Sequence, residues 1–230
     1  MKFTILTAFP DSFTSYFSSS IIKQAQNKNL VNIELINFRR EKGHKIDDYA
    51  YGGKTGMVLK IEPIVECLKT NNLLNHSIIL LSPSGKPLTQ QMARDLAKQE
   101  HIVMLCGHYE GIDARIQKYV THEVSIGDYL LTSGELAAMV ILDCVTRLIP
   151  GVINQQSLET ESFDEYLLDY PVYTRPPSFE GQDVPEIYLS GNHGEIEKFR
   201  KQEQERITKE RRPDLWKKYL KYKETNTKTE

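Results

Sequence analysis

The sequence predicts an α/β domain with a largely parallel sheet, followed by a linker and a small helical domain. Short apolar, β-branched runs alternate with helical periodicities over residues 3–148, and strands that alternate with helices form parallel sheets. Residues 152–183 are polar and contain prolines without a long period, and most of the chain after them has the pattern of charged helix. We therefore expect a first domain over residues 1–155, a flexible linker over 156–172 and a helical domain over 173–230.

The first half of the α/β domain is predicted as strand, helix, strand, loop and helix. Residues 3–9 are apolar and β-branched, and residues 32–38 alternate between apolar and polar types, so both are expected as strands. Asp11 is placed to cap a helix that continues to about Asn27. Residues 39–57 are polar and glycine-bearing and are expected as a long loop. A helix is expected over 61–70.

The second half repeats the alternation. Short apolar runs predict buried strands over 77–81, 102–106 and 123–126. Helical periodicity predicts helices over 89–100, with Thr89 as cap, over 112–120, and over 134–148, which Pro150-Gly151 ends. In the rest of the chain, helical pieces are expected over 163–169, 194–210 and 213–223.

Charge is distributed unevenly along the chain. The 230 residues carry a net charge of −2, and 40% of them are apolar, which is enough for a core. Residues 194–230 hold twelve Lys or Arg against eight Asp or Glu, whereas residues 1–193 hold seventeen against twenty-three. A basic tail on an acidic body is a common arrangement for binding nucleic acid. The alternative is a solvated basic helix without a partner.

Cysteine and histidine spacings give no metal or disulfide framework. Cys67, Cys106 and Cys144 lie in apolar runs without short pairings, which favours a reducing compartment. No two of the six histidines share a metal-ligand spacing on one helix, so no metal site is assigned. The sequence lacks a signal-peptide pattern and an apolar run near the length of a membrane span. We therefore expect a cytoplasmic protein without a membrane partner.

Two glycine-bearing segments predict a ligand pocket. Residues 125–134 read Ser-Ile-Gly-Asp-Tyr-Leu-Leu-Thr-Ser-Gly, and glycines let backbone groups approach a flat ligand closely. Residues 106–113, Cys-Gly-His-Tyr-Glu-Gly-Ile-Asp, add a carboxylate and aromatic rings. A nucleoside-bearing cofactor is therefore expected. A G-x-G-x-x-G loop is absent, and Gly53-Lys54-Thr55 is not the end of a P-loop, because Asp48 occupies the position of its first glycine.

Ten motifs, in order over nearly the whole chain, resemble the TrmD family of bacterial tRNA (guanine-N1) methyltransferases. Each motif alone is weak, but ten in order are specific. They are Thr7-Ala-Phe-Pro10, Asp47-Asp48, Tyr51-Gly-Gly-Lys-Thr-Gly-Met57, Leu81-Ser-Pro-Ser-Gly-Lys86, Cys106-Gly-His-Tyr-Glu-Gly-Ile-Asp113, Ser125-Ile-Gly-Asp-Tyr-Leu-Leu131, Gly134-Glu-Leu136, Arg147-Leu-Ile-Pro-Gly151, Tyr173-Thr-Arg-Pro176 and Leu189-Ser-Gly-Asn-His193.

The resemblance implies a SPOUT methyltransferase that transfers the methyl group of S-adenosylmethionine to N1 of the guanine immediately 3′ of the anticodon. It implies a deep trefoil knot and a homodimer, with the cofactor bound by residues 1–155, the candidate base in 156–172 and the tRNA anticodon stem-loop bound by 173–230. The cofactor residues that it implies are Leu81, Ser82, Pro83, Gly107, Tyr109, Glu110, Ile126, Gly127, Asp128, Tyr129, Leu130, Leu131 and Gly134.

The reaction sets three chemical requirements. Guanine N1 carries a proton at neutral pH, so a base must remove it, a cation must stabilise charge on O6, and N1 must be aligned with the methyl donor. By resemblance, Arg147 takes the O6 role and Glu161 is the base. The family usually has aspartate at that position, so three alternatives stay open: the backbone shifts to compensate for the longer side chain, the rate is lower, or Glu159 shares the role.

The resemblance also assigns residues to the RNA. Tyr109 would stack on the unpaired guanine, Gly56 would permit its approach, and Asp169 would lie near the guanine or the cofactor amino group. Phosphate contacts are expected from Arg211 and Arg212, with Lys198, Arg200, Lys201 and Arg206. Lys54, Thr55 and His108 depart from the family pattern, and Lys54 is a further candidate for a phosphate contact. A Mg²⁺ requirement is implied without a location.

Two rival interpretations stay open from the sequence. One is another SPOUT methyltransferase that acts on ribosomal RNA or on a ribose, although Arg147 and Glu161 favour chemistry at a base nitrogen. The other is a non-catalytic RNA-binding protein that keeps the cofactor fold, for which the departures at Lys54, Thr55 and Glu161 leave room.

Overall fold

The computed structural model describes residues 1–39, 45–53, 55–154 and 162–226. The chain forms two compact units, Met1–Asn154 and Gln155–Glu230, which are described separately. Three residues named above, Lys54, Glu159 and Glu161, lie outside the described residues.

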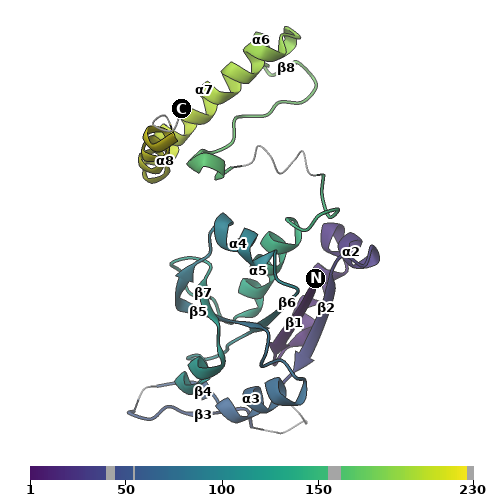
Figure 1. The fold of residues 1–230 in the computed structure, drawn as a ribbon, viewed down its shortest axis with the longest axis vertical. Coiled ribbons are helices and arrows are strands. Elements are labelled where there is room, and N and C mark those ends of the chain that lie inside the picture. The colour runs from purple at the N-terminus through teal and green to yellow at the C-terminus, as the bar shows by residue number, and fades with distance from the viewer. Residues whose placement is uncertain (40–44, 54, 155–161, 227–230) are drawn as a thin grey trace. The chain divides into compact units, whose positions relative to one another are not determined.

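A parallel five-stranded sheet forms the centre of the first unit (Figure 1). Its strand order is β2-β1-β6-β5-β7, and every neighbouring pair is parallel. The alternation of strands and helices predicted this arrangement correctly. The strands are β1 (Lys2–Thr7), β2 (Asn32–Asn37), β5 (Ser77–Pro87), β6 (His101–Leu105) and β7 (His122–Ser125).

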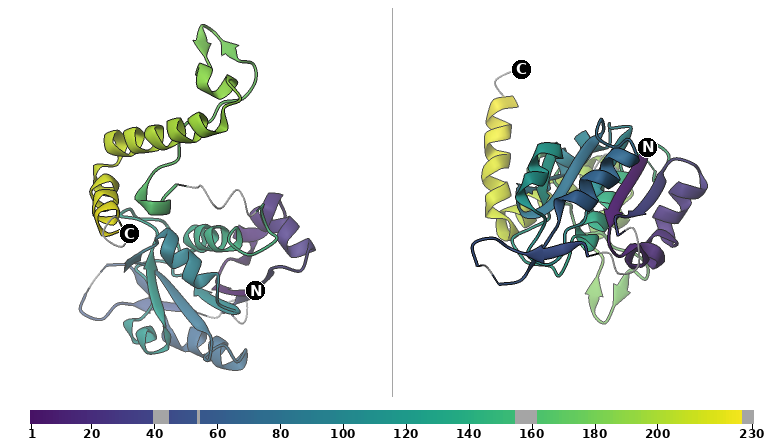
Figure 2. Two further views of the ribbon diagram at one scale, coloured as in Figure 1. Left: turned by 45° about the horizontal axis from the view of Figure 1, so that its top comes forward. Right: turned by 90° about the horizontal axis from the view of Figure 1, so that it is seen from below.

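Helices cover both faces of this sheet (Figure 2). One face packs Ile5 and Met104 against α1 (Thr14–Phe17), α2 (Ser20–Asn27), α4 (Gln90–Leu96) and α5 (Glu135–Thr146). The other face packs Leu6 and Leu105 against α3 (Ile61–Thr70) and the 3₁₀ helix η2 (Ala114–Tyr119). Successive strand residues point to opposite faces, and each fully buried Ile or Leu stabilises the fold by about 1.5–3 kcal/mol.

The predicted helix from Asp11 to Asn27 was wrong as a single element. The structure divides it into η1 (Pro10–Phe13), α1 and α2, and Asp11 lies inside η1 rather than capping it. Serines explain the interruption, because their hydroxyls compete for backbone groups. Ser18 and Ser19 donate to the carbonyl oxygens of Ser15 and Tyr16, and the chain turns between α1 and α2.

The predicted loop over residues 39–57 was also incomplete. It contains β3 (Asp47–Tyr49), which pairs antiparallel with β4 (Met57–Leu59). Three-residue strands are too short to give a visible alternation. Two boundaries also differ from the prediction, because β5 continues to Pro87 with a bulge and α4 ends at Leu96. The helix expected over 112–120 is a 3₁₀ helix, and the piece expected over 163–169 is only the short 3₁₀ turn η4 (Asp164–Tyr166).

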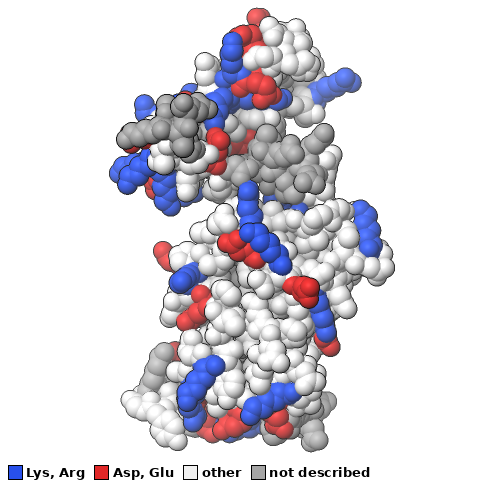
Figure 3. Space-filling view, viewed as in Figure 1, with Lys and Arg blue, Asp and Glu red and all other residues white. Residues whose placement is uncertain are grey.

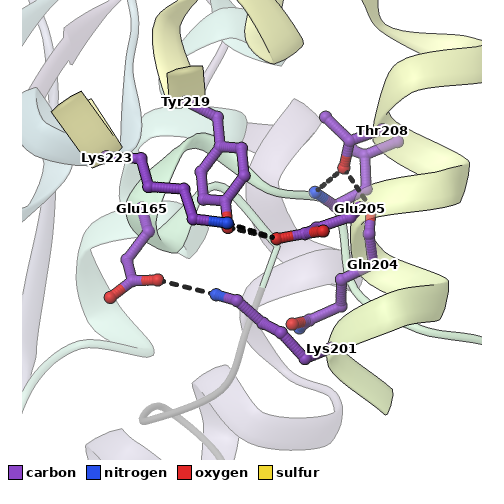
Figure 4. A network of polar contacts seen from close by, with 8 residues as sticks. Glu165, Lys201, Gln204, Glu205, Thr208, Tyr219 and Lys223 are labelled. Carbon is purple, nitrogen blue, oxygen red and sulfur yellow. Dashed lines mark hydrogen bonds and ion pairs between the residues drawn. The ribbon is translucent and has the colours of Figure 1, made fainter. Parts of the chain in front are cut away.

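The second unit is built on two helices, α7 (His193–Arg211) and α8 (Pro213–Asn226), preceded by a short α6 (Glu186–Leu189). A small hairpin, β8 (Ser178–Phe179) and β9 (Gln182–Asp183), lies in the stretch expected to be irregular. Thr208 anchors the preceding segment, because its hydroxyl accepts from the Leu168 N–H at 2.8 Å and donates to the Gln204 carbonyl at 2.6 Å (Figure 4). Tyr219 and Lys223 of α8 both donate to Glu205 of α7.

Candidate active site

The two glycine-bearing segments lie side by side at the carboxyl ends of β6 and β7. The Gly134 N–H donates to the Gly107 carbonyl at 2.9 Å, and His108 forms an isolated bridge with Ser133. A Cβ atom at residue 134 would come within 2.9 Å of the Cys106 Cα, so only glycine lets α5 begin this close to the 106–108 backbone.

The β3–β4 hairpin joins the same cluster. The Glu110 N–H donates to the Met57 carbonyl at 3.0 Å, and Leu59 bridges Ile112. Gly56 lies directly against the Glu110 side chain, since a Cβ atom at residue 56 would be 2.7 Å from the Glu110 Cγ. Two residues predicted for different roles, one for guanine and one for the cofactor, are therefore neighbours.

A bulge in β5 brings the third predicted cofactor segment to this edge. Leu81 and Lys86 both pair with Val124 of β7, so residues 82–85, which include Ser82 and Pro83, form a bulge between them. The Leu88 N–H then donates to the Ser125 carbonyl at 2.7 Å. The segment beginning at Ile126 therefore follows directly from the strand that this bulge borders.

Large apolar side chains of the cluster are turned to solvent. Tyr109 is 52% exposed, Tyr129 56% and Leu130 85%, although such groups are usually buried. Ile126 and Gly127 are half-buried and Asp128 is exposed beside them. Exposed rings and leucines over a glycine-rich backbone fit a flat apolar group with polar edges, such as an adenine.

Cys106, at the base of the cluster, is not a candidate nucleophile. It is fully buried, and burial, followed by the nearby Glu135 carboxylate, raises the pKa of its thiol well above the ordinary value. The thiol is therefore protonated at neutral pH, and its role is packing.

Arg147 is far from this cluster within one chain. It is the C-terminal cap of α5, whereas Gly134 is the N-terminal cap of the same helix. The helix has 12 residues, so at about 1.5 Å per residue its ends are about 18 Å apart. The structure thus brings the predicted cofactor residues together and leaves the predicted O6 ligand at the opposite end of the helix.

Comparison with known proteins decides the family. Residues 1–218 match the family model described as tRNA (Guanine-1)-methyltransferase TrmD. This chain belongs to that family.

Curated relatives of the family match over nearly their full length. The chain is 52% identical to a protein of Ureaplasma urealyticum serovar 10 over 96% of this chain and 98% of the relative. It is 50% identical to one of Mycoplasma genitalium over 99% and 100%, and 51% identical to one of Clostridioides difficile over 95% and 98%. All three are named tRNA (guanine-N(1)-)-methyltransferase.

In the second unit, most cations expected to contact tRNA are paired with acids. Arg206 pairs with Glu203 and Glu210, and Arg212 pairs with Asp214 at 2.7 Å. The Arg212 guanidinium lowers the pKa of Asp214 to about 2. Lys198, Arg200 and Lys201 pair with Glu195, Glu197 and Glu165.

Other cations of this unit are exposed without such partners. Within residues 162–226, no ion pair engages Lys209, Arg211, Lys217, Lys218 or Lys221. Sequence analysis named Arg211 but missed the other four, Lys209 on α7 and three lysines on α8, because it weighed motifs and charge totals rather than pairing along each helix. Lys and Arg side chains gather on the face of this unit around α8 (Figure 3).

The second unit also contains a cavity of about 1010 Å³. Its lining includes Tyr170, Tyr173 and Tyr188, and Arg200 lies over the Tyr170 ring at 4.9 Å. Asp169, predicted near the substrate, is half-buried next to this lining and accepts from the Tyr170 N–H at 2.7 Å. Aromatic rings beside a guanidinium are typical of surfaces on which unpaired bases stack.

Neither a metal cluster nor a membrane span is found in the described residues. No group of three or more His, Cys, Asp or Glu side chains there has the arrangement of a metal site. No helix among them has the length and apolar character to cross a membrane.

Proposed function

We propose that this chain transfers a methyl group from S-adenosylmethionine to N1 of the guanine immediately 3′ of the anticodon in tRNA. The observation that carries the proposal is the full-length match to relatives named for guanine-N1 methylation of tRNA. A cytoplasmic location follows from the tRNA substrate, and a Mg²⁺ requirement is retained as a prediction of the resemblance.

The cofactor would be held by the cluster at the ends of β5, β6 and β7. Leu81 and Ile126 would form apolar walls, with Tyr109, Tyr129, Leu130 and Leu131 exposed near them. Gly107 and Gly127 are half-buried, and Gly134 is buried where it lets α5 begin against the 106–107 backbone. Glu110 is an exposed carboxylate suited to ribose hydroxyls or to an amino group. When bound, S-adenosylmethionine supplies a methyl group already activated by its sulfonium.

The chain's own residues would prepare the guanine. Glu161 would take up the N1 proton, and Arg147 would stabilise the negative charge that spreads to O6, since a guanidinium stays protonated and donates charge-assisted hydrogen bonds. Tyr109 would offer a stacking surface, and the close approach of Gly56 to Glu110 supports a guanine site beside the proposed cofactor residues.

We also infer that the site is completed by a second copy of the chain. Arg147 is about 18 Å from the cofactor cluster along α5, and proton removal and O6 stabilisation require contact with the base. The outer face of α5 exposes Leu136 at 55% and Val140 at 41%, an apolar stripe suited to a homodimer interface. The trefoil knot is inferred from the family, with the placement of β6 between β1 and β5 as a compatible feature.

The second unit would bind the tRNA. Its exposed lysines and Arg211 suit phosphates, and its tyrosine-rich cavity suits an unpaired base. We assign cofactor binding and catalysis to residues 1–155, the base-carrying linker to 156–172 and tRNA binding to 173–230.

A labelled transfer assay tests the proposal. Methyl-labelled S-adenosylmethionine is incubated with a tRNA transcript carrying guanine 3′ of the anticodon and with one in which that guanine is replaced. Label only on the first, recovered as N1-methylguanine after digestion, is expected. Label on both transcripts or only on ribosomal RNA would move the target, and cofactor binding without transfer would identify a non-catalytic RNA-binding protein.

A further inference from the structure

A buried carboxylate lies beneath the cofactor cluster. Glu135, the first residue of α5, is 3% exposed. Its Oε1 accepts from the Thr7 hydroxyl at 2.6 Å and lies 3.0 Å from the Nε2 of His108. A buried carboxylate is costly unless donors satisfy it, and the Thr7 hydroxyl and the His108 ring are the groups that contact this one.

Thr7 connects the carboxylate to the loop after β1. It is fully buried at the end of that strand, and its hydroxyl both donates to Glu135 and accepts from the Phe9 N–H at 2.9 Å. The Phe9 ring packs on the His108 ring at 4.6 Å between centroids. The loop is thereby fixed against the same imidazole that faces Glu135.

His108 connects the carboxylate to the cofactor segment. It stands between Gly107 and Tyr109, and Tyr109 has a φ of +60°, a conformation that an L-residue adopts at a cost and keeps only when its surroundings hold it. Two contacts join the two glycine-bearing segments, and we call them together the joint. One is the main-chain hydrogen bond from the Gly134 N–H to the Gly107 carbonyl. The other is the side-chain contact between His108 and Glu135.

The Glu135 carboxylate is placed to accept two hydrogen bonds from the side chain at residue 108. The Nε2 of His108 faces both carboxylate oxygens, at 3.0 Å from Oε1 and 2.9 Å from Oε2. Among the described residues, Oε2 has no hydrogen bond of its own. A guanidinium at residue 108 could donate to both oxygens at once, so arginine is the conservative replacement there.

We propose that Glu135 and His108 are positioning residues that hold Gly107 and Tyr109 in the geometry that binds the cofactor. The inference rests on the proposed cofactor site. Neither side chain needs to touch the cofactor, because the joint acts through the backbone on either side of His108.

The test is a titration of S-adenosylhomocysteine, the demethylated product form of the cofactor, by calorimetry. We compare wild type, His108→Leu, His108→Arg, Glu135→Gln and the double variant His108→Leu/Glu135→Gln, with His76→Leu as the matched control. His108→Leu removes a hydrogen bond to a carboxylate, and we expect it to raise the Kd for S-adenosylhomocysteine roughly tenfold or more. His108→Arg should restore the wild-type Kd, and the double variant should be no weaker than His108→Leu by more than about twofold, because one joint is lost only once.

Steady-state kinetics separate positioning from a general loss of structure. His108→Leu should raise KM for S-adenosylmethionine by a larger factor than KM for tRNA, because Gly107 and Tyr109 are both proposed to bind the cofactor and only Tyr109 is proposed to contact the guanine. Equal Kd values in all variants, or an arginine variant as weak as the leucine variant, would overturn the inference. Failure of the wild type itself to bind S-adenosylhomocysteine would reject the proposed cofactor site, and the inference with it. If Glu135→Gln does not fold, the two His108 variants still decide the question.

Discussion

Gly56 and Glu110 come from distant segments, yet a Cβ atom at residue 56 would be 2.7 Å from the Glu110 Cγ and 3.0 Å from its Oε1. Gly56 also has a φ of +101°, which side-chain-bearing residues rarely adopt. This contact joins Gly56, which is predicted to permit the approach of the guanine, to the predicted cofactor segment.

Gly56→Ala should therefore displace Glu110 and lower kcat/KM for tRNA methylation by about tenfold or more, because small misplacements in a site cost large factors in rate. Gly52→Ala is the matched control, since Gly52 has a φ of +82° but nothing within 4 Å of its Cβ position. It carries the backbone strain without the collision. Equal losses in the two variants would mean that strain, not the Glu110 contact, causes the effect.

Arg211 should contribute more to tRNA binding than Arg206. Both are exposed on α7, but Arg206 pairs with Glu203 and Glu210, whereas Arg211 has no ion pair among the described residues. Arg211→Ala should weaken tRNA binding and reduce the slope of log affinity against log salt by about one. Titrations at several salt concentrations measure this. A larger change for Arg206→Ala would contradict the assignment.

His101 should make stability depend on pH below neutrality. Burial, followed by the nearby charges of His76 and Lys2, lowers the pKa of His101 to about 4, against the weaker opposing effect of Glu34. An unfolded histidine has a pKa of about 6.5, so the unfolded chain binds more protons between these values. The free energy of unfolding should therefore have its full value above about pH 6.5 and should decrease as the pH drops toward 4.

Urea unfolding at a series of pH values checks this prediction against His101→Gln, which keeps a polar partner for Thr4 but cannot titrate. The wild-type curve should fall more steeply than the variant curve between pH 6.5 and 4. Parallel curves would show that His101 is not the group responsible.

The exposed stripe on α5 should hold two copies together. Leu136→Glu places a charge in an interface that is proposed to be apolar, so it should shift sedimentation toward the monomer and reduce methyl transfer by a comparable factor. Glu66→Gln, on α3 at the opposite face of the sheet, is the control. An unchanged molar mass for Leu136→Glu at micromolar concentration would argue against this face.

The sequence was sufficient for the sheet and for the importance of the two glycine-bearing segments, because both depend on local signals, and their binding of a cofactor stays a prediction. Apolar runs such as 102–106 are strong evidence for buried strands, and the glycines at 107 and 134 lie where two backbones meet. It was insufficient for the β3–β4 hairpin, whose strands have three residues each and are held by bonds to Gly111 and Asp113 from another segment. Such long-range pairing leaves no local pattern.

Pairing among charged residues was likewise invisible in charge totals. The net charge of residues 194–230 did not distinguish Arg206, held between two acids, from the exposed Lys217 and Lys218. The helix predicted over 134–148, by contrast, already placed Gly134 and Arg147 near its two ends, and α5 confirms this with Gly134 and Arg147 as its two caps. That separation is the reason for proposing a site shared between two chains.

A mixed dimer tests this shared site most directly. One chain carries Arg147→Ala and the other carries Tyr109→Ala with Glu110→Ala, and the heterodimer is purified through two different tags. If Arg147 serves the cofactor cluster of its partner, one of the two equivalent sites is intact, and about half of the wild-type kcat should return although each variant homodimer is inactive. A heterodimer no more active than either homodimer would contradict the account, because Arg147 would then have to act within its own chain.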